Sequence, residues 1–170
     1  MNNSEQSKKV SVKRVGRGGY LHSIIPILDS SGKVIESVVK PLMVELRMRD
    51  VMQILVGSSI LAIPMAFTEE TWKLGQTLPL TNVIILAMVS ILFIGLFVYV
   101  NFYRFYLREF VWEYIKRVIS IYMLSLLVVG LLMTLIQQCP WGTDNLLAIK
   151  RIIIVTFPAS MSATVTDVIK

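Results

Sequence analysis

The strongest constraint on this chain is a run of 30 residues, 74–103, that contains no charged side chain. Three further uncharged runs, at 51–68, 118–143 and 152–166, accompany it. Helices on the surface of a water-soluble domain need a polar face, so such domains rarely hold four stretches of this kind. A bilayer core of about 30 Å requires roughly 20 mostly apolar residues in each spanning helix. The pattern therefore predicts an all-α membrane protein.

We expect a domain over 49–170 with four transmembrane helices, at about 51–68, 80–101, 118–137 and 147–166. Nine basic residues precede Asp50 and four lie between the second and third spans, against one and none in the other two connections. The positive-inside rule then places both termini in the cytoplasm. Lys150 and Arg151 depart from this rule, because the same topology puts them at the outer end of span four.

The fourth span is short. Only 15 uncharged residues separate Arg151 from Asp167, and at 1.5 Å per residue they cover roughly 22 Å. This helix can cross only if Lys150 and Arg151 extend toward the interface or are buried against partners.

The region before the spans has its own pattern. Residues 1–22 are polar and basic, which predicts a disordered tail, and 23–48 predict a cytoplasmic β-hairpin around Asp29–Gly32. Pro26 and Pro41 argue against either strand being central in a sheet. A lone hairpin is barely stable in water, so it must pack on the helices or pair with hairpins of neighbouring subunits. The second option is the first indication of a homo-oligomer.

The net charge of +6 is concentrated in this N-terminal region. A basic segment beside a span favours contact with anionic lipid head groups. Nucleic-acid binding is the rival interpretation, and we reject it because no nucleic-acid-binding motif follows. A second basic segment, 102–117, holds seven aromatic residues, which are typical of the membrane interface. It predicts a helix that projects from the bilayer or an interfacial hairpin, with lipid-binding residues Arg104, Arg108 and Lys116.

At the outer end of span one, Pro64, Thr68 and two adjacent carboxylates, Glu69 and Glu70, are candidates for an ion pathway. Ionisable groups beside lipid are functional candidates, and a ring of glutamates in an oligomer concentrates cations at a pore mouth. Two other interpretations stay open. The glutamates can be merely interfacial, or they can pair with Lys150 and Arg151.

Span four supplies a second polar helix. Its hydroxyls at Ser160 and Thr164 are candidates for an ion pathway, although such a stripe is more often packing between helices. Small residues in spans one and four favour close packing, so we expect these two helices inside the bundle and spans two and three toward lipid. Asp167, near the inner end, is expected to meet Arg104 or Arg108.

Catalytic signatures are absent from the sequence. The chain has one histidine, His22, and one cysteine, Cys139, so a histidine pair, a cysteine-rich metal site and an intramolecular disulfide cannot form. Gly16-Arg17-Gly18-Gly19 lies in a polar tail and not between a strand and a helix, as a phosphate-binding loop would. We therefore expect no enzyme, no cofactor and no metal.

Several stretches resemble a known family, and these are Lys40–Glu45, Arg49–Ile54, Ala66–Trp72, Val98–Arg104, Ile115–Ser120 and Phe157–Ser160. The Phe-Thr-Glu-Glu segment at 67–70 is the most specific. The chain is similar to prokaryotic integral membrane proteins grouped as a domain of unknown function. This resemblance implies a stand-alone protein of the prokaryotic plasma membrane, and it carries no activity, ligand or site residue.

The sequence thus favours a small homo-oligomeric channel or transporter for cations, lined by spans one and four, with Glu69 and Glu70 at its outer mouth. The alternative is a non-transporting scaffold or accessory subunit that binds a partner protein or anionic lipid through its N-terminal region.

Overall fold

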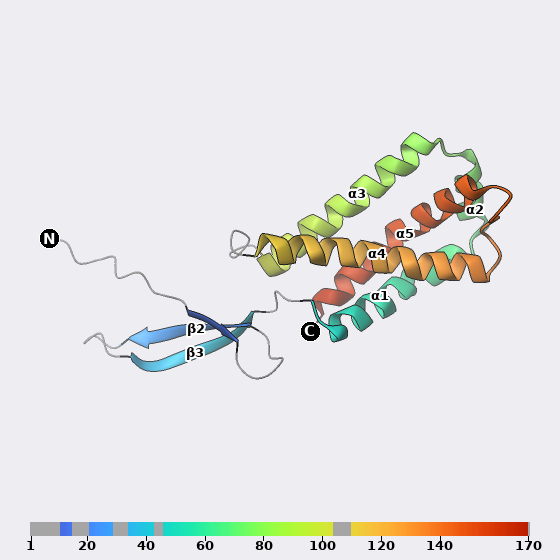
Figure 1. Ribbon diagram of the computed structural model, residues 1–170. Coiled ribbons are helices and arrows are strands. Elements are labelled where there is room, and N and C mark those ends of the chain that lie inside the picture. Colours follow the sequence, from blue (N-terminus) through green and yellow to red (C-terminus); the bar gives the residue numbers. More distant parts are fainter. Residues whose placement is uncertain (1–10, 15–20, 29–33, 43–45, 104–109, 170) are drawn as a thin grey trace. The chain divides into compact units, whose positions relative to one another are not determined.

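The computed structural model describes residues 11–14, 21–28, 34–42, 46–103 and 110–169, and it describes side chains over 46–103 and 110–169. The chain divides into two units, Met1–Glu45 and Leu46–Lys170, which are drawn in Figure 1.

The first unit contains an antiparallel sheet in the order β1-β2-β3, formed by Ser11–Arg14, Leu21–Leu28 and Val34–Leu42. Strands β2 and β3 occupy the two segments from which a hairpin is predicted, and β1 lies within the predicted tail. Pro26 opposes Ser37 of β3, beyond Ile24, the last residue of β2 that pairs with β1. Among the described strands, β2 therefore has a neighbour on one side only at Pro26, which a residue without an N–H tolerates. Within the tail predicted over 1–22, the structure places β1 and the first two residues of β2, and 1–10 and 15–20 lie outside the described residues. The cytoplasmic position of this unit stays a prediction.

The described part of the second unit is all-helical. Its elements are α1 (Met48–Ala66), α2 (Glu69–Thr77), α3 (Leu80–Val98), the π-helical turn η1 (Tyr99–Tyr103), α4 (Val111–Leu135) and α5 (Asn145–Val168). As predicted, four helices are long and apolar enough to cross a membrane: α1, α3 with η1, α4 and α5. Successive long helices run in opposite directions (Figure 1).

Helix α1 ends at Ala66, two residues before the predicted end of span one, and Glu69 and Glu70 lie beyond it. They form the first turn of the separate helix α2. Two side chains donate hydrogen bonds to the last carbonyls of α1. The Trp72 indole N–H donates to the carbonyl of Ala66 at 2.7 Å, and the Thr68 hydroxyl donates to that of Met65 at 2.8 Å. These bonds replace the next helical turn and let the chain change direction.

Helix α4 begins at Val111, seven residues before the predicted start of span three. A prediction from hydropathy alone leaves the charged residues of this first stretch outside the span. They are accommodated on the helix because Glu113 and Lys116 pair with each other at an exposed position, at 3.0 Å, and Arg117 is paired inside the bundle.

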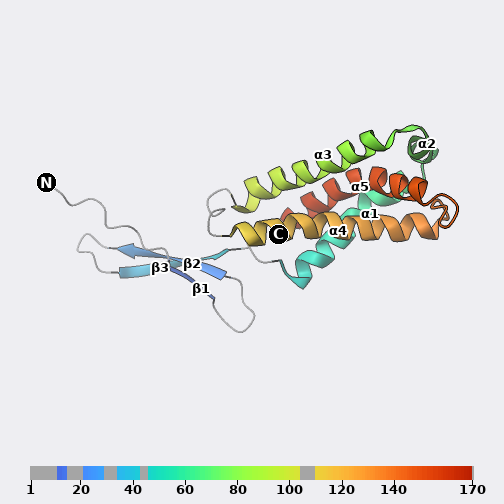
Figure 2. The same ribbon diagram turned by 45° about the horizontal axis from the view of Figure 1, so that its top comes forward.

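Helix α5 is the centre of the bundle. Half of its span is buried, against 28% for each of the other three spans, and it contacts α1, α2, α3 and α4 (Figure 2). The expectation that spans one and four are both interior is therefore right only for α5. Helix α1 buries a narrow small-residue face and exposes large side chains such as Met52 and Ile60 on the other side.

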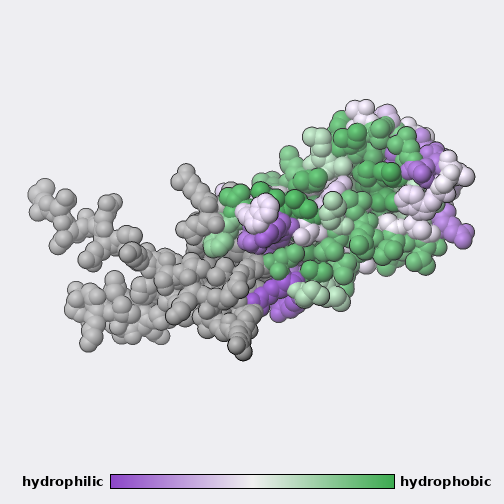
Figure 3. Space-filling model, viewed as in Figure 1, coloured by the Kyte–Doolittle hydropathy of each residue, from purple (hydrophilic) through white to green (hydrophobic). Residues whose placement is uncertain are grey.

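The α1–α5 contact is close because Gly57 lies there. A Cβ atom on Gly57 would be 2.6 Å from the Cβ of Thr166 and 3.0 Å from the Cα of Ala163. Small residues at helix contacts of this kind allow backbones to approach in membrane bundles. The outer surface of the helices in view is largely apolar, with polar residues toward the two ends (Figure 3).

Candidate functional site

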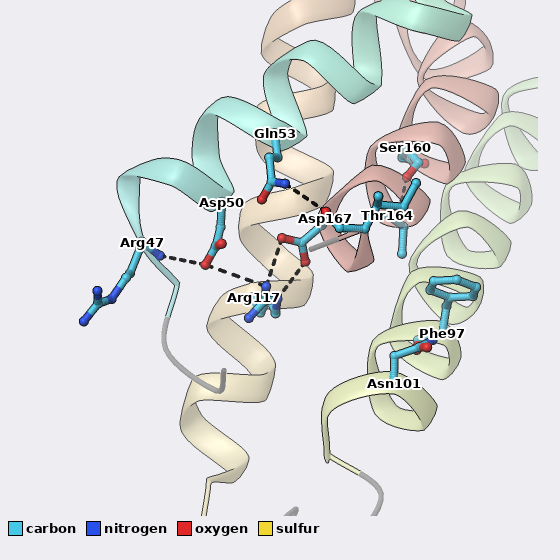
Figure 4. A network of polar contacts seen from close by, with 10 residues as sticks. Arg47, Asp50, Gln53, Phe97, Asn101, Arg117, Ser160, Thr164 and Asp167 are labelled. Atoms are coloured by element: carbon cyan, nitrogen blue, oxygen red, sulfur yellow. Dashed lines mark hydrogen bonds and ion pairs between the residues drawn. The ribbon is translucent and has the colours of Figure 1, made fainter. Parts of the chain in front are cut away.

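Three charged side chains from three helices are buried together at one end of the bundle. Arg117 of α4 donates from Nε to Oδ2 of Asp167 at 2.8 Å and from Nη2 to Oδ1 at 2.9 Å, and Oδ2 of Asp50 lies 3.8 Å from Nη2 (Figure 4). All three side chains have zero exposure. We call these residues the charged cluster and this end of the bundle the Asp50 end.

Asp50 is positioned by the start of α1. Its Oδ2 accepts the backbone N–H of Arg47 at 3.1 Å, and a carboxylate in the first turn is stabilised by the positive end of the helix dipole. One turn further, the Gln53 amide donates to the carbonyl of Ile169 at 3.0 Å. The first turns of α1 are thus fastened to the end of α5, which carries Asp167.

Arg117 is held on two sides. Its guanidinium pairs bidentately with Asp167, and its Cζ lies 4.0 Å from the centre of the Phe102 ring in η1. The desolvation of a buried charge costs several kcal/mol unless the charge is paired and hydrogen-bonded, and a cation over an aromatic face contributes about 0.5–2 kcal/mol. The cluster therefore joins α1, η1, α4 and α5 through one guanidinium.

A line of hydroxyls runs along α5 from the cluster. Thr156, Ser160 and Thr164 are buried at intervals of four residues, on one face of the helix. Thr164 donates to the carbonyl of Ser160 at 2.6 Å and Thr156 to that of Ile152 at 2.7 Å. Ser160 reaches across to the Ser90 hydroxyl of α3 at 2.8 Å. Most of this line is satisfied within its own helix.

The opposite end, which we call the Glu69 end, carries the predicted acidic pair on its surface. Glu69 and Glu70 are exposed, and Glu69 forms an ion pair with Lys73 of the same helix at 2.9 Å. Pro64 is exposed on α1. Thr68 is half-buried, and its hydroxyl contacts that of Thr71 at 2.7 Å. Within this protomer the acids face outward.

Arg151 also lies at the Glu69 end, as the predicted charge pairing requires, but it contacts backbone instead of glutamate. Its Nε donates to the carbonyl of Trp72 at 3.3 Å and its Nη1 to that of Gln138 at 2.6 Å. Gly75 of α2 packs on it, since a Cβ there would be 2.5 Å from Cγ of Arg151. Lys150 beside it is half-buried. The buried Arg151 thus fastens α2 and the α4–α5 connection to α5.

The comparisons with known proteins agree with this architecture. The family described as "Putative integral membrane protein (DUF2391)" matches residues 29–169. The chain belongs to this family. It is an integral membrane protein with four candidate spans, and its family has no known function. No curated protein and no solved structure matches the chain.

Membership places the charged cluster inside a membrane protein. Asp167 pairs with Arg117. Its predicted partners, Arg104 and Arg108, lie outside the described residues. The remaining lipid-binding candidate, Lys116, is exposed, pairs with Glu113 and lies 5.5 Å from the centre of the Trp112 ring. Within the described residues, no group of three His, Cys, Asp or Glu side chains could hold a metal ion.

Sequence reasoning did not select Asp50 or Arg117, although a signal for Arg117 exists. Apart from Val118, the buried residues of α4 recur every four positions, and these are Arg117, Ile121, Ser125, Val129 and Met133. Extending this apolar period backward places Arg117 on the interior face. A buried arginine then requires a carboxylate at the same end of the bundle, and Asp50 and Asp167 lie there at the ends of α1 and α5.

Proposed function

We propose that this integral membrane protein is a small channel or transporter for cations. The observation that supports it is the charged cluster, in which Asp50, Arg117 and Asp167 are buried from three different helices. Ionisable side chains within spans are expensive beside lipid, and those that face the bundle interior commonly mark ion or proton pathways.

The proposal includes an orientation. With both termini in the cytoplasm of a prokaryotic cell and the helices in its plasma membrane, the Asp50 end is inner and the Glu69 end is outer. The charged cluster is then the ion-binding position at the inner end of the pathway, and the hydroxyls of Ser160 and Thr164 lie between the two ends. Pro158, inside α5, lacks the N–H that the carbonyl of Ile154 would accept. A backbone carbonyl that lacks its helical hydrogen-bond donor can coordinate an ion inside a membrane.

Glu69 and Glu70 are the ion-binding position at the outer end of the pathway. Because both are exposed on the single protomer, they act on ions together only in a homo-oligomer, where copies of α2 surround an axis. A ring of carboxylates at such a mouth raises the local cation concentration.

Flux into liposomes tests this function. Purified protein reconstituted with a cation-sensitive dye inside the vesicles is expected to pass K⁺, Na⁺ or H⁺ above the leak of empty vesicles. Asp167→Asn should abolish this flux, and the double variant Glu69→Gln with Glu70→Gln should reduce it severalfold. Glu113→Gln, which changes a half-buried acid on α4, is the matched control and should not change it. Folded protein in tight vesicles would overturn the proposal.

A second candidate is a non-transporting scaffold or accessory subunit. It is favoured by the hydroxyls of Thr156 and Thr164, which are satisfied within α5 and need no ion. On this account the vesicles stay tight, and the N-terminal region binds a partner protein or anionic lipid. Deletion of residues 1–19 should then abolish recovery of the partner in a pull-down from the native membrane.

A further inference from the structure

Arg151 of α5 is a buried cation that has no carboxylate partner among the described residues. It is 8% exposed, and its two hydrogen bonds go to the backbone carbonyls of Trp72 and Gln138. The ion pairs in the described part of the chain do not include it. Lys150, the preceding residue, is half-buried and lies outside those pairs as well. Two adjacent positive charges at the Glu69 end are therefore left without a described carboxylate.

Arg117, the other buried arginine of the described bundle, shows the difference. It faces two carboxylates, those of Asp50 and Asp167. Arg151 faces carbonyls, and a carbonyl oxygen accepts an N–H group but leaves the net charge in place. Gln138 follows the last turn of α4, and the negative end of a helix stabilises a nearby cation. That contribution is smaller than the cost of an uncompensated buried charge, so the charge balance favours an anion at Arg151.

The Arg151 guanidinium keeps donors for such an anion. Arginine carries five N–H groups, and Nε and Nη1 each donate one of them to a carbonyl, which leaves three. Two of the remaining groups are on Nη2. The planar fork of a guanidinium matches the oxygens of a phosphate group, which it can bind through two parallel hydrogen bonds.

The guanidinium is fixed at a level of the bundle that is typical of the membrane interface. Gly75 of α2 packs on the Arg151 side chain, since a Cβ there would be 2.5 Å from Cγ of Arg151. Trp72 is half-buried beside it, and Trp141 in the connection between α4 and α5 is 49% exposed. Tryptophan is enriched where lipid head groups meet the apolar core, and the phosphate groups of lipids lie at this level.

We propose that Arg151 binds an oxyanion, namely a phosphate group that is carried by a lipid head group or is free in solution. The unused N–H groups of Arg151 donate to the phosphate oxygens, and Lys150 adds a second positive charge from the adjacent position of α5. The anion compensates the buried guanidinium, while the two carbonyl contacts keep it oriented. The inference concerns the Glu69 end only and does not depend on transport.

Thermal unfolding of the full chain in detergent micelles tests this site. The probes are inorganic phosphate, compared with chloride at equal ionic strength, and phosphatidylglycerol, compared with diacylglycerol of identical acyl chains. We expect at least one phosphate probe to raise the unfolding midpoint, by roughly 5–10 °C at about 100 times its Kd. A rise with phosphatidylglycerol alone assigns the site to a lipid head group, and a rise with inorganic phosphate shows that the free ion can bind.

Three variants locate the effect. Arg151→Met should abolish the rise, and Lys150→Gln should lower the affinity about fivefold, which corresponds to ~1 kcal/mol per basic residue near an anionic head group. Lys150→Gln leaves the carbonyl contacts of Arg151 in place, so it decides the question where Arg151→Met does not fold. Lys73→Gln removes an exposed positive charge at the same end. It is the matched control and should keep the full rise.

Two results would overturn the site. One is a wild-type midpoint that neither phosphate probe raises. The other is a full rise in Arg151→Met, or in Lys150→Gln where Arg151→Met does not fold. Neither measurement uses ion flux, so the anion site and the proposed transport can fail separately.

Discussion

Loss of the Asp167 carboxylate charge should be the most damaging conservative change in the bundle. Asp167→Asn keeps the shape of the side chain but removes the anion that binds Arg117 through two hydrogen bonds of 2.8 and 2.9 Å. Removal of one partner from a fully buried ion pair costs about 3–5 kcal/mol. Neutral hydrogen bonds between membrane helices are worth only ~0.6 kcal/mol on average. Since asparagine still accepts one hydrogen bond, we expect a loss near 3 kcal/mol, which is about a 100-fold change in the unfolding equilibrium.

The assay is reversible unfolding in mixed micelles with increasing SDS, followed by tryptophan fluorescence. The matched control is Glu113→Gln, which removes an ion pair on the same helix whose two side chains are 29% and 47% exposed. Exposed pairs contribute at most about 1 kcal/mol. The double variant Arg117→Met with Asp167→Leu should recover most of the loss, because it removes both buried charges. Equal destabilisation by Asp167→Asn and Glu113→Gln would refute the reasoning.

Three further changes test individual contacts. Gly57→Leu should destabilise the bundle by about 1–3 kcal/mol through overpacking against Thr166, and SDS unfolding measures it; a wild-type midpoint would contradict the close α1–α5 approach. Arg151→Met should release α2, seen as faster amide exchange over 69–77 with exchange in α3 unchanged, whereas uniform exchange changes would count against its fastening role. Burial raises the pKa of the Cys139 thiol, so alkylation at pH 8 should be at least tenfold slower than for a cysteine introduced at Thr143, and rapid labelling by mass spectrometry would exclude this environment.

The spans could be predicted because their cause is local. An uncharged run long enough for a bilayer is visible residue by residue, and α3 begins at the predicted Leu80. The break between α1 and α2 could not be predicted in the same way. It depends on the Trp72 side chain folding back onto the carbonyl of Ala66, and hydropathy carries no information about such a contact.

The charged cluster shows the same limit. Asp167 was recognisable as an expensive charge near a span, but its partner depended on which face of α4 turned inward. Arg117 lies in a segment that hydropathy assigns to the interface, and only the four-residue period of buried positions reveals its direction. Arg151 was placed at the correct end. Its partners are backbone carbonyls of Trp72 and Gln138, and the availability of a carbonyl is a property of the folded chain.

Single-cysteine labelling measures the crossing of the membrane by these helices most directly. In a Cys139→Ser background, cysteines at Glu70 and Thr143, exposed toward the Glu69 end, and at Met48, exposed at the Asp50 end, would be treated with a membrane-impermeant maleimide on intact spheroplasts. We expect labelling at 70 and 143 from outside, and labelling at 48 only after the membrane is opened. Reaction of 48 and 70 from the same side of the membrane would contradict the four-span architecture.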